Sequence, residues 1–83
     1  MPVVFPKDMA AAKDLMNEMK TVIAFLAAET EEAERLKETA NKRPLKNNEI
    51  RRGEELLELC RKNRAWLKKA EEALAKFFRP AAA

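Results

Sequence analysis

Histidine and tyrosine are absent from this 83-residue sequence, and glycine and cysteine each occur once. Without histidine the chain lacks the usual general base near neutral pH, and it cannot form the paired Glu-x-x-His ligands of a di-iron bundle. The single cysteine, Cys60, excludes an intrachain disulfide and a cysteine-rich metal site. No glycine-rich phosphate loop occurs either. We therefore expect no enzyme activity, no catalytic residues, no metal and no cofactor.

Long apolar runs are also missing. The longest run, residues 22–28, is far shorter than the roughly 20 residues that a membrane-spanning helix needs. The first seven residues lack the basic and then apolar order of a secretory signal. We therefore expect a cytoplasmic protein without membrane contact. The closing residues Ala81, Ala82 and Ala83 resemble a cloning scar.

Apolar residues make up 47% of the sequence and charged residues 37%. This balance is typical of long helices with charged outer faces, not of a disordered tail. The length predicts a single domain over residues 1–80, and a core of this size is only marginally stable by itself. Because a disulfide staple is excluded, association with another chain is the expected source of additional stability.

A first long helix is predicted over about residues 8–42. The two prolines of residues 1–6 favour an extended lead-in before it, and Asp8 is a suitable N-cap. No helix breaker follows until Pro44, whose ring disfavours helical geometry at the preceding residue. The sequence therefore predicts a turn at about residues 43–47.

A second helix of similar length is predicted over about residues 48–79 and ends before Pro80. Asn47 or Asn48 is the expected N-cap. A start after Gly53 is the alternative for this helix, because glycine is unfavourable in a helix interior. Two helices of matched length joined by a short turn pack antiparallel. We therefore expect an all-α, two-helix hairpin.

Each predicted helix carries an apolar arc of roughly 160°, which is wider than one partner helix covers. The arc therefore predicts a further neighbour, and we expect two hairpins to pair as a homodimer in a four-helix bundle. The central stripes, at helical spacing, are Leu15, Met19, Val22, Leu26 and Ala33 in the first helix, and Leu56, Cys60, Leu67, Ala70, Leu74 and Phe78 in the second.

The bulky apolar residues cluster toward the chain termini, whereas the turn end carries many charges. We therefore expect a thin, solvated turn end, with ion pairs Glu31–Arg35 and Glu38–Lys42. Association is expected at the other end, because one chain cannot cover all of its aromatic residues. The predicted interface comprises Met9, Met16, Met19, Phe25, Asn63, Trp66, Leu67, Phe77 and Phe78.

Two polar or reactive residues fall within the apolar arc of the second helix. Asn63 either specifies register or oligomeric state, as a buried asparagine does in coiled coils, or lies at the edge of the arc and binds water. Cys60 has no histidine to activate it, so we expect a small buried core residue. The turn position predicts the register that joins Leu36 to Ile50, Leu26 to Cys60, Met19 to Leu67 and Met9 to Phe77.

These features predict a non-catalytic protein-interaction module of the adaptor, co-chaperone or assembly-factor type. The alternative is a small dimeric nucleic-acid-binding regulator that uses Arg61, Arg64 and Lys68, although Glu58 and Glu72 weaken the charge of that face. No motif points to a family. The expected shape is similar to that of small dimeric hairpins, which include plasmid RNA-binding regulators and secretion co-chaperones, and this likeness is one of shape alone.

Overall fold

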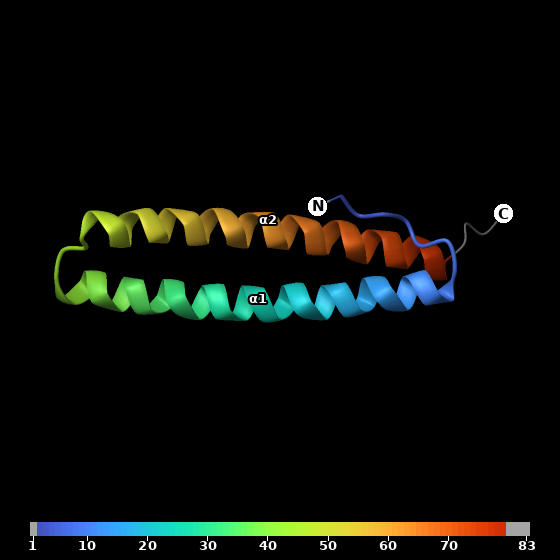
Figure 1. Ribbon diagram of the computed structural model, residues 1–83, viewed down its shortest axis with the longest axis horizontal. Helices are drawn as coiled ribbons and strands as arrows, with labels where there is room; N and C mark the ends of the chain where they lie inside the picture. Colours follow the sequence, from blue (N-terminus) through green and yellow to red (C-terminus); the bar gives the residue numbers. More distant parts are fainter. Residues whose placement is uncertain (1, 80–83) are drawn as a thin grey trace.

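Two long antiparallel helices make up most of the molecule. The computed structural model describes residues 2–79, so the expected stop at Pro80 and the expected scar at residues 81–83 lie outside the described part. Helix α1 spans Met9–Lys42 and helix α2 spans Asn47–Phe78, and they lie side by side along their whole length (Figure 1). The molecule measures 59 × 20 × 17 Å. The predicted all-α hairpin is confirmed.

Helix α1 begins and ends for the local reasons that the sequence indicates. The Asp8 carboxylate accepts a hydrogen bond from the backbone N–H of Ala11 at 2.8 Å, so the predicted N-cap is confirmed. At the other end Arg43 adopts an extended backbone, and its N–H donates to the Thr39 carbonyl at 3.0 Å. The helix therefore ends at Lys42, two residues before Pro44.

Helix α2 begins at Asn47, with Lys46 in the capping position, so the predicted cap by Asn47 or Asn48 is wrong. The side chain of Glu49 replaces it. Its carboxylate accepts from the Lys46 backbone N–H at 2.9 Å and from both terminal guanidinium nitrogens of Arg43, each at 2.9 Å. This Arg43–Glu49 clasp ties the end of α1 to the start of α2 and leaves no capping role for asparagine.

Gly53 lies inside α2, so the alternative start after this residue is wrong. Its φ is not positive. A methyl group added at Gly53 would meet only the Leu36 Cδ1 atom, at 4.0 Å, which is an ordinary van der Waals distance. Glycine costs a helix interior about 1 kcal/mol relative to alanine. Nothing in the fold of a single chain therefore requires glycine at this position.

The core lies in the half of the hairpin that holds the termini. Leu15, Val22, Trp66 and Ala70 form a buried cluster, against which Met19, Leu67 and other residues pack. Cys60 is buried, as predicted. Met19 and Leu67 both pack against this cluster, and Leu36 lies near Gly53, about one turn from the expected Ile50. The helices therefore follow the predicted register to within about one turn.

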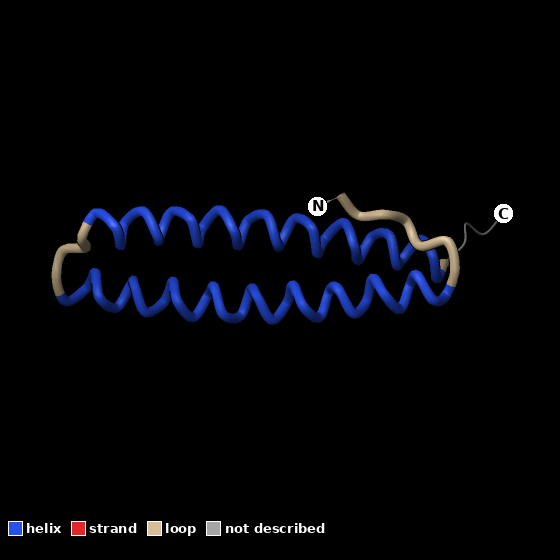
Figure 2. The backbone as a smooth tube through the Cα atoms, in the orientation of Figure 1, coloured by secondary structure: helices blue, strands red, loops and turns tan. Residues whose placement is uncertain are grey.

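The segment before α1 is part of the core rather than a free lead-in. We call residues 2–8 the strap; it turns back at the start of α1 and runs along α2 toward the middle of the hairpin (Figure 2). Val3 packs against the core cluster and Pro6 is buried. Trp66, a member of this cluster, is only 8% exposed within a single chain. The sequence predicts Trp66 at the interface, whereas the structure buries it within the single chain, where the strap packs against the same cluster.

Candidate interaction surface

The hairpin has two broad faces, one on each side of the plane that contains both helices. Residues seven apart lie on the same side of a helix in a coiled-coil pair, so sequence spacing and contacts together assign each face. One face carries the strap, and beyond it an ion pair in which Arg52 Nε lies 2.6 Å from Glu32 Oε2. We call this the strap face. The strap and this ion pair lie over part of this face.

We call the opposite side the open face. A groove there is lined by Lys37 from α1 and by Ile50 and Leu57 from α2, which places these residues on one side of the hairpin. Residues at seven-residue intervals from them extend the face along the whole molecule. These are Met9, Met16, Ile23, Thr30 and Lys37 in α1, and Ile50, Leu57, Arg64, Glu71 and Phe78 in α2.

Large apolar side chains are exposed on the open face. Nine are exposed among the described residues, and five of these belong to this face. The most exposed of the five is Leu57, at 72%. The five residues are Met9, Ile23, Ile50, Leu57 and Phe78. The strap does not reach this side, so the chain itself provides no cover for them.

The groove near the turn has a volume of about 320 Å³. Its apolar lining comes from Ala33, Leu36, Ala40, Leu45, Ile50, Gly53 and Leu57, with Lys37, Glu49 and Glu54 also in the lining. No residue from 23 to 55 is buried, which agrees with the expected thin, solvated turn end, but the apolar lining of the groove was not expected. The sequence feature that indicates this groove is the seven-residue spacing of Ile50 and Leu57. Both residues lie on the flank of the predicted stripe that begins at Leu56. Of the two ion pairs expected here, Glu31–Arg35 forms at 3.2 Å, whereas Glu38–Lys42 is not among the ion pairs of the described residues.

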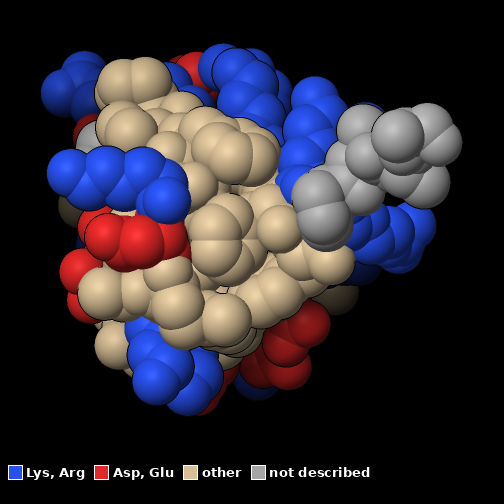
Figure 3. All heavy atoms as spheres, turned by 90° about the vertical axis from the view of Figure 1, so that its right-hand side faces the viewer, with Lys and Arg blue, Asp and Glu red and all other residues tan. Residues whose placement is uncertain are grey.

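The nine residues predicted as one interface do not form one patch. Met9, Phe25 and Phe78 are exposed, and Trp66 is buried. The half-buried members are Met16, Met19, Asn63, Leu67 and Phe77. Met9 and Phe78 belong to the open face, whereas Phe25, 57% exposed, lies on the same side of α1 as Glu32 and hence on the strap face. The terminal end does present uncharged residues at its centre with charged residues around them, as Figure 3 shows.

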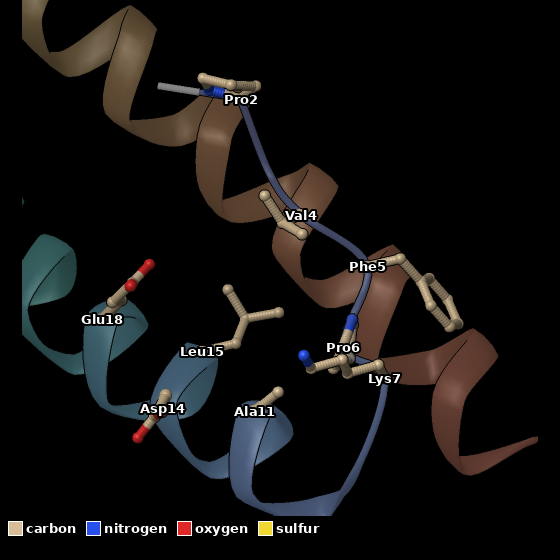
Figure 4. A pocket seen from close by; sticks show the side chains of 9 residues that line it. All are labelled: Pro2, Val4, Phe5, Pro6, Lys7, Ala11, Asp14, Leu15 and Glu18. Atoms are coloured by element: carbon tan, nitrogen blue, oxygen red, sulfur yellow. The ribbon is translucent and has the colours of Figure 1, made fainter.

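A second cavity, of about 410 Å³, lies between the strap and α1. Leu15 points from α1 toward the strap, whereas the Phe5 ring points away from α1 (Figure 4). Asp14, Glu18 and Lys7 also line this cavity, so it is partly polar. The sequence did not indicate it, because its walls come from a segment without helical periodicity.

Asn63 forms a side-chain hydrogen bond to the other helix of the same chain. Its side-chain Nδ2 donates to both carboxylate oxygens of Glu29, at 3.0 and 3.3 Å. The Cys60 thiol lies 4.0 Å from the same carboxylate. Both Asn63 and Glu29 are half-buried, so the pair joins α1 to α2 across the helix interface. This hydrogen bond ties α1 to α2 through the Asn63 side-chain nitrogen.

The charged groups mostly pair with one another. Hydrogen bonds from Arg43, and then from the Lys46 backbone, lower the pKa of the Glu49 carboxyl to about 2. Arg61 holds the pKa of Glu58 below its usual range in the same way, through a contact of 2.6 Å. Arg61, one of the three candidate polyanion contacts, is therefore already engaged within the chain.

Arg64 and Lys68, the other two candidate polyanion contacts, are exposed and form no ion pair within residues 2–79. The indole Nε1 of Trp66 is buried and finds no hydrogen-bond acceptor in the described part of the chain. Among these residues no three potential metal ligands come together. The open face therefore presents exposed apolar side chains, with the cations Arg64 and Lys68, unpaired in the described chain, near the middle of α2.

Comparisons with protein-family models, with curated proteins and with solved structures found no match to this chain. Over residues 2–79, neither helix combines the length and the apolar character needed to cross a membrane. The open face is therefore the feature from which a function can be argued.

Proposed function

We propose that this protein is a non-catalytic interaction module, which pairs with a second copy of itself as a four-helix bundle and, in that form, binds another protein. An adaptor, co-chaperone or assembly factor in the cytoplasm would fit this description. The observation that supports the proposal is the row of exposed apolar side chains on the open face. Monomeric proteins rarely expose contiguous apolar surface beyond a few hundred Å², and larger patches mark interaction sites.

The strength of this association can be estimated from the side chains that it would bury. Fully burying one large aliphatic or aromatic side chain contributes about 1.5–3 kcal/mol, and a half-exposed one gains about half of that. Five such residues per chain then supply roughly 10 kcal/mol to a symmetric pair. Association itself costs about 4–15 kcal/mol. The two amounts are similar, so we expect a dimer that dissociates on dilution.

Nucleic-acid binding is the alternative, and the charge distribution disfavours it. Arg61 is paired with Glu58, so only Arg64 and Lys68 remain unpaired within residues 2–79 among the three candidate polyanion contacts. Binding to phosphates weakens steeply with added salt, whereas an apolar interface does not. A salt titration of any complex therefore separates the two functions.

The solution mass tests the proposal, because one chain has a mass of 9.5 kDa and the dimer twice that. Light scattering over a dilution series should show the dimer at high concentration, and the melting midpoint should rise with concentration. Leu67→Ala removes a half-buried leucine at the core, so it should cost about 2 kcal/mol and lower the midpoint at every concentration. Glu34→Ala, an exposed control, should stay within about 0.5 kcal/mol. A monomer at high concentration whose midpoint ignores dilution would refute self-association.

A further inference from the structure

We infer that the second copy stacks on the open face with both turns at the same end, so that α1 of each chain lies against α2 of the other. This places Lys37 of one chain beside Glu54 of its partner, twice in the dimer. The inference rests on the proposed self-association and adds to it the face, the orientation and the contacts. Three features of the open face carry it.

The first feature is the length of the apolar row. It runs from Met9 and Phe78 at the terminal end to Ile50 at the turn end, which is nearly the full length of both helices. A short peptide would cover one part of this row and leave the rest exposed. Only another pair of helices of the same length covers all of it, and a second hairpin is such a pair.

The second feature is the position of the unpaired positive charge. Arg64 and Lys68 occupy the middle of α2, on the open-face side of that helix. If the turns lay at opposite ends, a two-fold axis would cross the middle of the hairpin and stack α2 on α2. That arrangement would bring the two Arg64 side chains together at the axis, and like charges in contact are unfavourable.

With the turns at the same end, α2 instead meets α1 of the partner. The open-face residues at the middle of α1 are Ile23 and Thr30, both uncharged. The aliphatic part of the Arg64 side chain can then lie along Ile23 while its charged end reaches solvent. The distribution of charge therefore selects one of the two symmetric arrangements.

The third feature is the rim of the groove near the turn. Lys37 on α1 and Glu54 on α2 line the same groove from its two helices, and neither forms an ion pair within residues 2–79. A two-fold axis along the helices exchanges the two rims, so each lysine meets a glutamate of the partner. The groove floor includes Gly53, where the single chain has room for a side chain and shows none. A partner helix that approaches closely would use that space.

Cysteine cross-linking distinguishes the two orientations. We would combine Cys60→Ala, which removes the buried native thiol, with one exposed cysteine per chain, and cross-link mixtures of two variants with a short bis-maleimide. Thr30→Cys mixed with Leu57→Cys should give at least fivefold more cross-linked dimer than Thr30→Cys mixed with Ile23→Cys. All three positions are exposed, so the variants should fold, which circular dichroism would verify. If Cys60→Ala does not fold, the same mixtures can be made with Cys60 in place, since its thiol is buried.

The outcomes separate this inference from the proposed function. A dimer that cross-links through Thr30 and Ile23 instead has its turns at opposite ends, which overturns the orientation alone. A dimer that neither mixture cross-links uses a face other than the open face, which overturns the inference and leaves self-association intact. A monomer by light scattering overturns both.

Discussion

Detaching the strap should expose Trp66, and a single substitution can achieve this. Val3→Asp would place a carboxylate against the core cluster, where an unpaired charge is very costly, so the strap should leave its site instead. The half-buried valine contributes about 1 kcal/mol, and the tryptophan surface that the strap covers adds about as much. The loss of about 2 kcal/mol should lower the melting midpoint by roughly 10 °C in a domain of this size.

Tryptophan fluorescence is a direct assay of this change, because Trp66 is the only tryptophan and the chain has no tyrosine. The emission of Val3→Asp should shift to longer wavelength, and acrylamide should quench it more strongly than in the wild type. Val4→Asp is the matched control, since Val4 is 79% exposed, and it should change neither property. Equal effects of the two substitutions, or unchanged emission from a folded Val3→Asp, would refute the role assigned to the strap.

Two further predictions concern polar contacts. Asn63→Ala removes the amide that binds the half-buried Glu29 carboxylate, so it should lower the free energy of unfolding in urea by about 1–2 kcal/mol. Asn17→Ala, at an exposed site, is the control and should lower it by less than about 0.5 kcal/mol. Similar losses for the two variants would mean that the Asn63–Glu29 bond does not stabilise the hairpin. Because the pKa of Glu49 falls from 4.5 to about 2 on folding, its clasp stabilises the protein above pH 4.5 and loses that contribution as the pH falls toward 2. Glu49→Gln should therefore show a shallower loss of urea stability than the wild type across that range, and parallel curves would argue against the clasp.

Local features of the sequence determined the helices and the seam between them. Asp8 offers a carboxylate to the free N–H groups at the start of α1, and Pro44 forces the backbone before it out of helical geometry. Both effects act within a few residues and do not depend on the rest of the fold. The spacing of Leu15, Val22 and Cys60 likewise determines that they face the other helix, because helical geometry alone sets which residues share a side.

Tertiary structure alone decided which surfaces stay open. The strap has no periodicity, so nothing in its sequence shows that Val3 returns to cover Trp66 on one face. The clasp at Glu49 and the bond from Asn63 to Glu29 depend on side chains that come together only once the two helices pack. The width of an apolar arc shows that a helix needs more than one neighbour. Which neighbour covers which part of it depends on the path of the whole chain, and here that path covers part of the strap face and none of the open face.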